Sequence, residues 1–574
     1  MRYLPFCACV VGVVAAKCYD PSPAFPVPTW GKSGPILPRS AFEAIEQLVE
    51  NAVNGSFKTS SFSVEVTSNT DTLWSYHRSA SIHDKERPGV TKVDSESQYR
   101  IASITKTFTT LAILYQHAAG NLSLDNSILD HLPELEGKDY GTLPMKDITL
   151  RILASQLSGI PREFAFADVL LVGVDPVDFG LPPVSKSVLN PCYSQPGAPE
   201  CDRADLIHEL VKMKPIFAPN QQSTYSNLAF DLLGLAIETS TGLNYSTYIE
   251  QAIFAPLNMT FASLETPPND DHAVLPVGGN YWGEEESVQR PTGGIYASSS
   301  DMSKYLRYVL THYNAIAKGI NWFMPASWST GMNTFYGMPW EIARSNKILL
   351  DSNRPVTLVT KGGALPGYFS IIVMLPEYGL GVTILVGGDS NLMPILEEAI
   401  TVPLIRSAEA AIWKNINATI AGAYIATNPS LNSTITLESS PTSGLRLTTF
   451  ISNSTDFLHD ILPLIAGEFL GSDADTPYRI QLTPTLLYQN ETTQSGEIWR
   501  MLLMSDHVKG KTNVWEYFCH TDVDPLSYAG LPINEVVFWH DEGIVELPAW
   551  KLTLRPAEAE ERREGLIVQG RGDL

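Results

Sequence analysis

The order of apolar and polar positions predicts a chain of mixed helices and strands. Apolar residues at helical spacing predict an amphipathic helix over Ala41–Val53. Alternating positions then predict two strands, around Phe62–Val66 and Thr72–His77. Helical spacing returns over Ile104–Leu114, and Gly120 is a natural C-terminal cap for that helix. A helix and a strand pair therefore lead into a second helix.

The middle of the chain continues with elements of both kinds. Ile148–Leu157 is predicted as a helix that ends near Gly159, and Leu228–Gly242 as a largely apolar helix. Tyr368–Leu375 and Gly381–Val386 are predicted as two strands.

The character of the chain changes after Ala411. The remaining residues are rich in threonine and serine, and turns separate short strand-like runs. These runs are Leu445–Ile451, Arg479–Thr483, Glu497–Met504, Glu535–Trp539 and Gly543–Pro548. We therefore predict a separate C-terminal domain over residues 411–574, built as an antiparallel sheet or a small barrel.

Composition and charge limit the partners. With 574 residues, of which 44% are hydrophobic and 18% charged, the chain is long enough for two or more globular domains. Lys and Arg number 39 against 62 Asp and Glu, which gives a formal net charge of −23. Such a field repels phosphate backbones and anionic membranes, so no nucleic acid is expected as a partner. No His-x-x-x-His spacing occurs, and no metal site is predicted.

The first residues have the pattern of a secretory signal. Residues 1–16 combine one arginine with a short apolar run, and Val14 and Ala16 are placed like a signal-peptidase site. The run is too short for a comfortable membrane span, and no other stretch is long and apolar enough to cross a bilayer. The alternative is a signal anchor that stays attached. We expect a secreted or luminal protein without stable membrane insertion, in which residues 17–38 form a proline-rich extended arm.

Cysteine usage indicates the same oxidising compartment. Once the signal is removed, an even set of four cysteines remains, namely Cys18, Cys192, Cys201 and Cys519. Cys192 and Cys201 bracket a polar, proline-rich loop and pair most naturally with each other. Cys18 would then pair with Cys519, and the alternative to both bridges is free buried thiols.

Asn-x-Ser/Thr sequons point to a glycosylated eukaryotic product. They lie at Asn54, Asn121, Asn244, Asn258, Asn417, Asn432, Asn453 and Asn490. Sequons also arise by chance, so only some of them need to carry a glycan.

The only Ser-x-x-Lys in the chain joins Ser103 to Lys106, at the start of the helix predicted from Ile104. Residues three apart lie on one face of a helix, so the Lys106 amine can reach the Ser103 hydroxyl. A serine hydroxyl is a poor nucleophile until a base takes its proton, and a partly desolvated lysine can act as that base. The alternative is two polar residues on a solvated helix face. The spacing favours acyl transfer.

A second candidate site, Tyr225 and Asn227, ends the loop before the helix Leu228–Gly242. A phenol beside a lysine ammonium ionises more easily and can serve as a general base. The amide of Asn227 can donate to a substrate carbonyl and accept from an amine. The alternative is structural, because Ser226 or Asn227 is also a good helix N-cap.

A third candidate site, Lys361-Gly362-Gly363-Ala364, follows the strand-like run Val356–Thr360. Adjacent glycines let a ligand approach the backbone closely, and an edge strand that lines a pocket can offer an N–H to an oxyanion. A lysine there would bind an anionic group or set the local field. The alternative is a plain turn.

In this order, the three sites resemble the serine beta-lactamase and penicillin-binding-protein superfamily, and most of all class C beta-lactamases and their esterase-like relatives. Supporting phrases are YRIASITK, ITLRILASQLSGIP, PTGGIYASSSDMSKYL and GGALPGYFS. The resemblance implies an α+β domain over residues 39–410, in which a five-stranded antiparallel sheet flanked by helices stands beside a helical lobe. Fungal secreted relatives also carry a C-terminal all-β domain.

The resemblance also implies a role for each residue of the site. Ser103 is the acylated nucleophile, Lys106 its activating amine, and Tyr225 the general base or proton relay. The substrate-binding set consists of Asn227, Lys361, Gly362, Gly363 and Ala364. Within it, Asn227 contacts the substrate amide, and the backbone N–H groups of Ser103 and Ala364 form the oxyanion hole. No cofactor is implied.

One position departs from the family pattern. The third motif of the family is commonly Lys-Thr-Gly or His-Thr-Gly, whereas residue 362 is glycine. The missing hydroxyl would help to hold the carboxylate of a beta-lactam or a D-alanyl peptide. Losing such a bond costs about 1.5–3 kcal/mol, or about tenfold to a hundredfold in affinity. We therefore do not expect an efficient beta-lactamase.

The sequence favours a secreted serine hydrolase that cleaves an ester or amide in a small-molecule or peptide-like substrate. One alternative is an acyltransferase, in which a secondary-metabolite alcohol or amine replaces water. Another is an inactive relative that binds peptides, which the presence of Ser103, Lys106, Tyr225 and Asn227 disfavours. An α/β-hydrolase is not expected, because no Gly-x-Ser-x-Gly occurs.

Overall fold

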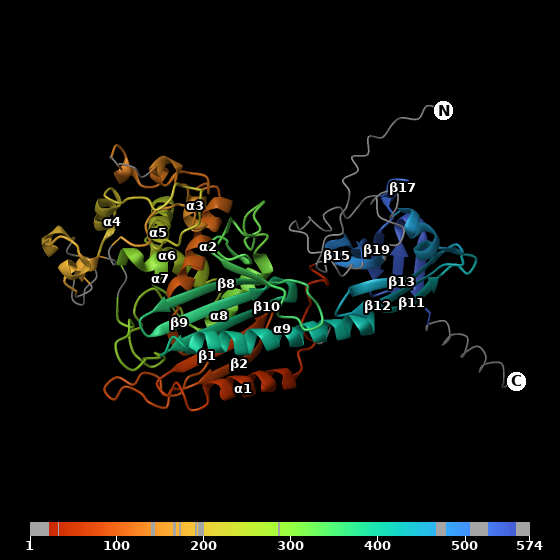
Figure 1. Cartoon of the computed structure of the whole chain (residues 1–574), viewed down its shortest axis with the longest axis horizontal. Helices are drawn as coiled ribbons and strands as arrows, with labels where there is room; N and C mark the ends of the chain where they lie inside the picture. Colours follow the sequence, from red (N-terminus) through yellow and green to blue (C-terminus); the bar gives the residue numbers. More distant parts are fainter. Residues whose placement is uncertain are drawn as a thin grey trace. The chain divides into compact units, whose positions relative to one another are not determined.

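The structure is a computed structural model, and it divides into two compact units (Figure 1). It describes residues 22–31, 34–138, 140, 144–164, 168–171, 174–189, 192, 200–284, 287–465, 478–505 and 526–557. One unit, which contains the residues predicted to be catalytic and is here called the catalytic unit, comprises Pro38–Ser345 and Thr357–Leu404. The other, called the barrel unit, takes the described residues before Pro38, Asn346–Val356 and those from Ile405 onward.

The catalytic unit is built on an eight-stranded sheet with the strand order β2-β1-β10-β9-β8-β7-β6-β5. Its strands are β1 (Ser61–Ser68), β2 (Thr72–Arg78), β5 (Ser327–Trp328), β6 (Thr334–Tyr336), β7 (Glu341–Ser345), β8 (Val356–Leu365), β9 (Tyr368–Leu375) and β10 (Leu380–Gly387). Pairing is antiparallel from β2 through β8. The family resemblance implied five strands, and the third candidate site suggested an edge position for the strand of Lys361. Three further short strands continue the sheet past β8, so both expectations are wrong.

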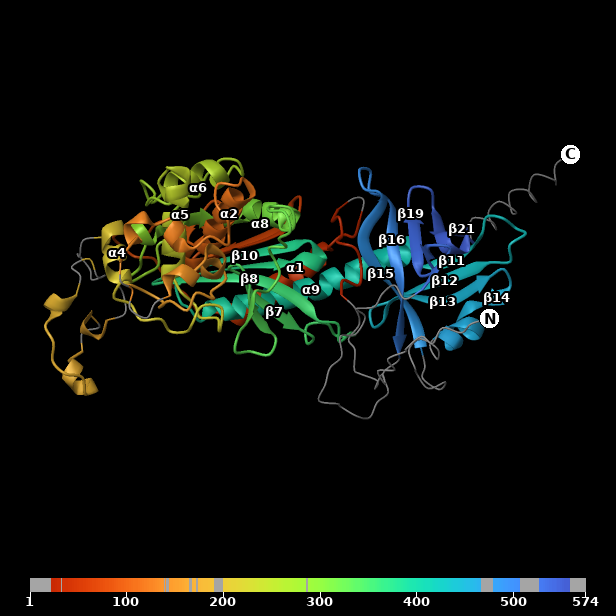
Figure 2. The same cartoon turned by 90° about the horizontal axis from the view of Figure 1, so that it is seen from above.

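Helices cover both faces of this sheet (Figure 2). On one face, Phe42 of α1 (Arg39–Val53) stacks on Trp74 of β2, which lies opposite Val66 of β1. On the other face, Ser303 of α8 (Ser299–His312) donates a hydrogen bond to Glu65, the neighbour of Val66 along β1. Successive side chains of a strand point to opposite faces, so α1 and α8 enclose the sheet between them. The first part of α9 (Leu392–Thr419) lies on the side of α1 (Figure 2).

A helical lobe stands beside the sheet (Figure 1). Its helices are α2 (Thr105–Ala118), α3 (Leu150–Ala154), α4 (Arg203–Leu210), α5 (Leu228–Thr241), α6 (Tyr245–Ile249) and α7 (Arg290–Gly293). The short strands β3 (Gln98–Arg100) and β4 (Tyr296–Ser298) pair beside it. The helix predicted over Ile148–Leu157 is shorter than expected, because Gln156 takes a left-handed φ of 61° that ends it. Gly120 has a φ of 76° just past α2, as predicted for a C-terminal cap.

The barrel unit confirms the predicted C-terminal β domain. Its strands are β11 (Gly422–Ala426), β12 (Thr434–Ser440), β13 (Gly444–Ser452), β14 (Thr455–Asp456), β15 (Tyr478–Asn490), β16 (Ser495–Ser505), β19 (Glu535–Trp539), β20 (Ile544–Leu547) and β21 (Leu552–Pro556), with β17 (Ser527–Tyr528) and β18 (Leu531–Pro532) as a separate pair. All pairings in the large sheet are antiparallel, and the pairing of β12 with β13 closes eight of its strands into a barrel. The α+β fold class with an all-β C-terminal domain is therefore confirmed.

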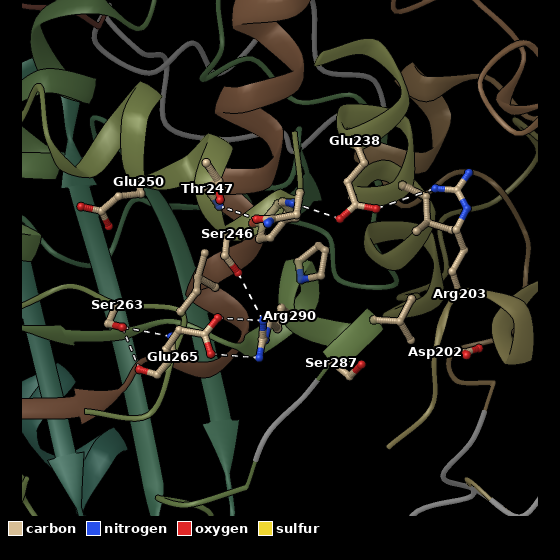
Figure 3. Close-up of a pocket in the computed structure, with 17 residues that line it drawn as sticks. Asp202, Arg203, Glu238, Ser246, Thr247, Glu250, Ser263, Glu265, Ser287 and Arg290 are labelled. Atoms are coloured by element: carbon tan, nitrogen blue, oxygen red, sulfur yellow. Dashed lines mark hydrogen bonds and ion pairs between the residues drawn. The ribbon is translucent and has the colours of Figure 1, made fainter. Parts of the chain in front are cut away.

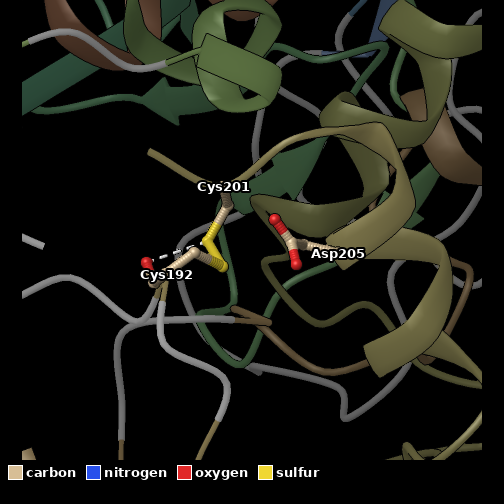
Figure 4. Close-up of side chains that lie close together, drawn as sticks. All are labelled: Cys192, Cys201 and Asp205. Atoms are coloured by element: carbon tan, nitrogen blue, oxygen red, sulfur yellow. Dashed lines mark hydrogen bonds between the residues drawn. A yellow bond between two sulfur atoms is a disulfide. The ribbon is translucent and has the colours of Figure 1, made fainter. Parts of the chain in front are cut away.

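The expectations about the cellular compartment can be compared with the structure at the described cysteines and sequons. The predicted disulfide between Cys192 and Cys201 is present (Figure 4). Cys18, Cys519 and the predicted signal over residues 1–16 lie outside the described residues. The asparagines of all eight sequons are exposed, and their glycosylation stays a prediction. Among the described helices, none is both long and apolar enough to cross a membrane.

Candidate active site

Ser103 lies in a short 3-10 turn, Ala102–Ile104, directly before α2. Ala102 has a φ of 47°, a left-handed conformation that residues with a Cβ adopt rarely and at a cost. The turn presses against β8, where a Cβ at Gly363 would lie only 2.4 Å from the carbonyl oxygen of Ile101. Glycine at position 363 therefore admits the chain's own Ser103 turn, which is a different role from the approach of a ligand.

Lys106 reaches Ser103 as the helix spacing predicted. Its Nζ donates to Ser103 Oγ at 3.0 Å and to the carbonyl oxygen of Thr292, in α7, at 2.8 Å. Burial lowers the pKa of the Lys106 amine, because the charged form loses its hydration, and the nearby charge of Lys361 lowers it further. Both effects favour the neutral amine that can take a proton.

The phenol of Tyr225 lies among three basic side chains. Lys106 Nζ and Lys361 Nζ are each 5.3 Å from the centre of its ring, and the guanidinium of Arg162 is 4.7 Å from it. Burial alone would raise the pKa of this phenol. The charges of Lys106 and Lys361 and a hydrogen bond with Ser103 outweigh burial and bring the pKa of Tyr225 down to about 8. The phenol is therefore placed and tuned to act as a base.

Lys361 has an anionic partner on the neighbouring strand. Its buried Nζ donates to Glu341 Oε1 of β7 at 2.7 Å and to the carbonyl oxygen of Gly362 at 2.7 Å. Glu341 Oε2 accepts the backbone N–H of Gly362 at 3.0 Å. Burial alone would lower the pKa of Lys361, but Tyr225 and Glu341 raise it above its ordinary value. Lys361 therefore stays an ammonium.

Asn227 takes a position that sequence reasoning did not anticipate. Its Nδ2 donates a hydrogen bond to Glu163 Oε1. Burial raises the pKa of that carboxyl, although Asn227 and Lys106 act in the opposite direction. Asn227 makes no capping bond for α5, where Ser226 Oγ instead accepts the N–H of Ala229 at 3.1 Å. Of the two capping candidates, Ser226 fills that role.

One cavity of about 550 Å³ gathers most of the predicted site. Six residues of the predicted site line this cavity, namely Ser103, Tyr225, Lys361, Gly362, Gly363 and Ala364. Lys106 is fully buried beneath Ser103, and Asn227 is absent from the lining. The cavity is also lined by Arg162, Tyr336 and Glu341. Sequence reasoning missed these three, because a single polar residue in a short strand or loop carries no motif.

Two other polar clusters lie away from Ser103. A second cavity of about 550 Å³ (Figure 3) is lined by acidic and basic side chains, and its two arginines pair with acids: Arg290 with Glu265 at 2.8 Å and Arg203 with Glu238 at 3.7 Å. In the described part of the chain, metal-ligating atoms converge at Cys192, Cys201 and Asp205 (Figure 4). The two sulfur atoms there are bonded to each other, so neither is a thiolate ligand.

Comparisons with known proteins extend over both units. The family described as Beta-lactamase matches residues 58–401, and the family described as Beta-lactamase-like-like, C-terminal domain, matches residues 413–558. The Probable hydrolase clz13 of Cochliobolus lunatus is 31% identical over 96% of this chain and 93% of its own length. The Beta-lactamase-like protein of Arthroderma benhamiae is 27% identical over 94% of this chain and 95% of its own length.

Among solved structures, a class C beta-lactamase covers 63% of this chain and 95% of its own, with 17% identity and a TM-score of 0.47. A beta-lactamase/D-alanine carboxypeptidase from Yersinia pestis, complexed with citrate, covers 63% and 97%, with 20% identity and a TM-score of 0.48. The first family match takes in more than half of the chain, including the cavity around Ser103. The chain therefore belongs to the beta-lactamase family, with the C-terminal domain found in beta-lactamase-like proteins.

Proposed function

We propose that this protein is a serine hydrolase that cleaves an ester or amide through an acyl-enzyme at Ser103. The observation that carries the proposal is the contact of Ser103 Oγ with Lys106 Nζ at 3.0 Å, beside a Tyr225 phenol whose pKa is about 8. A nucleophile within hydrogen-bond reach of a tuned base is the arrangement that covalent catalysis requires. The name of the Cochliobolus lunatus relative, Probable hydrolase clz13, agrees with this reaction class.

In the first step, the Tyr225 phenolate or the neutral Lys106 amine takes the proton of Ser103, and Oγ attacks the substrate carbonyl. The same proton then passes to the departing alcohol or amine, and an ester of Ser103 remains. Water then attacks the carbonyl of this ester with the same proton transfers. The acid is released and Ser103 Oγ regains its proton. Because Tyr225 and Lys106 are strongly coupled, the pair titrates as one unit and shares the proton.

Two backbone N–H groups support a site for the developing oxyanion. Gly362 directs its N–H toward Glu341 of β7, away from β9, and alternate residues of a strand direct their N–H to the same edge. The N–H of Ala364 therefore points to that side as well. A Cβ at Gly363 would lie 3.0 Å from Ser103 N, which brings the Ser103 turn beside the same stretch of β8. Ala364 and Ser103 then form the oxyanion hole.

The substrate that we propose is a small-molecule or peptide-like ester or amide, and the protein works outside the cytosol. The disulfide between Cys192 and Cys201 suits an oxidising compartment. The asparagines of all eight sequons are exposed, as glycan attachment requires. Secretion through the signal over residues 1–16 and glycosylation belong to the same proposal.

The proposal is tested by ester and anilide hydrolysis with the wild type, Ser103→Ala and a matched control. Ser187→Ala is a suitable control, because Ser187 is an exposed serine in the same unit. The expected result is a loss of several orders of magnitude in kcat/KM for Ser103→Ala only. Equal rates in all three proteins would contradict the proposal. Repeating the assay with an added alcohol acceptor shows whether the acyl group goes to water or to the acceptor, as an acyltransferase would require.

A further inference from the structure

The cationic group best placed to hold a substrate anion is already occupied by the protein's own carboxylate. Glu341 spans Lys361 and Gly362, with Oε1 2.7 Å from the ammonium and Oε2 3.0 Å from the backbone nitrogen. These are two charge-assisted donors of the kind that binds a ligand carboxylate. A second carboxylate would have to displace Glu341 or bind beside it with like charge.

The other cation of the cavity is paired as well. Arg162 Nε lies 3.5 Å from Glu163 Oε1, and its guanidinium stacks on the Tyr225 ring. Among the described residues that line the cavity, Arg162 and Lys361 are the cations, and each has an acidic partner. The net charge of −23 adds a long-range field that disfavours anions. A substrate carboxylate therefore finds no unmatched positive charge here.

No Asp, Glu, Lys, Arg or His is among the described residues that line the adjoining cavity. It holds about 630 Å³ and shares Tyr225 and Tyr336 with the cavity of Ser103. Its lining consists of aliphatic, hydroxyl, amide and aromatic side chains, including Gln222 and the exposed Trp328. Such a surface suits a neutral group that offers an apolar face and hydrogen-bonding atoms.

We propose that the Ser103 site takes uncharged esters or amides, and that Glu341 is the residue that excludes carboxylate-bearing ones. This inference rests on the proposed function and names its substrate class. Glu341 acts in two ways: its charge repels an incoming carboxylate, and its two oxygen atoms hold the donors that would otherwise bind one. Penicillins, cephalosporins and D-alanyl peptides, all of which carry a carboxylate, are then poor substrates.

The test compares two aryl acetates of nearly the same shape. Methyl 3-acetoxybenzoate is neutral, and 3-acetoxybenzoate carries a carboxylate where the first has a methyl ester; the reaction measured is release of acetate from the phenol oxygen. The measured quantity is the ratio of kcat/KM for the neutral ester to that for the anion, in the wild type, Glu341→Gln and Glu398→Gln. Glu398 is an exposed carboxylate of the same unit, so its variant controls for the change in net charge. Effects on Ser103, Lys106 or Tyr225 apply to both esters and cancel in the ratio.

The expected result is a clear preference of the wild type for the neutral ester, and a ratio at least about tenfold lower in Glu341→Gln, as expected for one charge-assisted interaction. Glu398→Gln should keep the wild-type ratio. A wild type without this preference, or an unchanged ratio in Glu341→Gln, would overturn the inference. Turnover of either ester in that case would still support the proposed function. Failure of the wild type to turn over either ester, together with no adduct at Ser103 from a neutral fluorophosphonate, would overturn both.

A second measurement needs no variant, in case Glu341→Gln does not fold. Methyl 3-hydroxybenzoate and 3-hydroxybenzoate are compared as competitors that slow fluorophosphonate labelling of wild-type Ser103. The neutral compound should protect Ser103 at a concentration at least about tenfold lower than the anion. Equal protection, or stronger protection by the anion, would overturn the role of Glu341.

Discussion

Lys106 Nζ divides its hydrogen bonds between Ser103 Oγ, at 3.0 Å, and the carbonyl oxygen of Thr292, at 2.8 Å. The backbone acceptor fixes where the amine lies, and the amine in turn fixes the rotamer of the serine. Thr292 is itself anchored, since its Oγ1 donates to the carbonyl oxygen of Asn227 at 2.9 Å. The arrangement joins α2, α7 and the start of α5 around one hydroxyl group.

Replacing Lys106 by methionine keeps the length of the side chain and removes the amine. We expect kcat to fall by about 10²- to 10⁴-fold, the usual contribution of a general base, with a smaller effect on KM. Lys318→Met serves as the control, because Lys318 is an exposed lysine of the same unit. Steady-state kinetics of the two variants would refute a role of the amine if both retained the wild-type kcat.

The pH dependence of the reaction follows from Tyr225. The base form is the phenolate, so kcat/KM should rise with pH and reach half of its plateau near 8, the lowered pKa of this phenol. Tyr225→Phe should lose this inflection together with most of the activity. A wild-type profile that stays flat between about pH 6 and 9 would show that neither Tyr225 nor its partner Lys106 titrates as proposed.

The two adjacent glycines of β8 offer a matched pair of substitutions. A Cβ at Gly363 would lie 2.4 Å from the carbonyl oxygen of Ile101 and 2.6 Å from Ser370 Oγ, whereas at Gly362 the nearest atom is 3.5 Å away. Gly363→Ala should therefore destabilise the catalytic unit by about 1–3 kcal/mol, as overpacking does, and displace Ser103. Gly362→Ala should leave the melting temperature nearly unchanged. Similar melting curves for both variants would contradict the close approach.

Restoring the hydroxyl at position 362 should help little by itself. The Cβ of a threonine would lie 3.5 Å from Glu341 Oε2, so its hydroxyl would donate to the carboxylate that is already there. We expect Gly362→Thr to leave acylation by a penicillin almost unchanged, and Gly362→Thr with Glu341→Gln to increase it beyond the sum of the single effects. Additive effects in a double-mutant cycle, measured as acylation rates, would argue against this coupling.

The disulfide between Cys192 and Cys201 closes a short loop, with a sequence separation of 9. Constraining a loop of that length contributes about 2–3 kcal/mol in the chain-entropy account. Replacing both cysteines by serine should lower the melting temperature of the catalytic unit and expose the segment to proteases. An unchanged melting temperature and unchanged proteolysis would show that the bridge has no part in stability.

Much of the fold follows from local patterns in the sequence. Apolar spacing marks α1, α2 and α5 within a few residues, alternation marks β1 and β2, and strand-like apolar runs mark β9 and β10. The end of α3 was missed, because it depends on the left-handed backbone of Gln156, a residue with no turn preference of its own. The strands β5 to β7 are two to five residues long and were too short for a periodic signal.

The candidate site was predictable to the extent that it rests on motifs. Short sequence patterns indicate the chemistry of Ser103, Lys106 and Tyr225, and the structure brings these residues together. Glu341 and Glu163 lie near the site only because segments distant in the sequence meet in the fold. No local sequence pattern predicts such a contact. Asn227 shows the opposite case: its residue type suggested substrate contact, whereas tertiary packing turns its amide toward Glu163.

The central claim is that Ser103 forms a covalent acyl-enzyme. It is tested most directly by intact-mass spectrometry of the deglycosylated protein after brief exposure to an activated ester and to a fluorophosphonate, followed by peptide mapping. The account predicts one added acyl or phosphonyl group on the peptide that contains Ser103, and none on Ser103→Ala. Unmodified wild-type protein with both reagents, or the same added mass on Ser103→Ala, would contradict it.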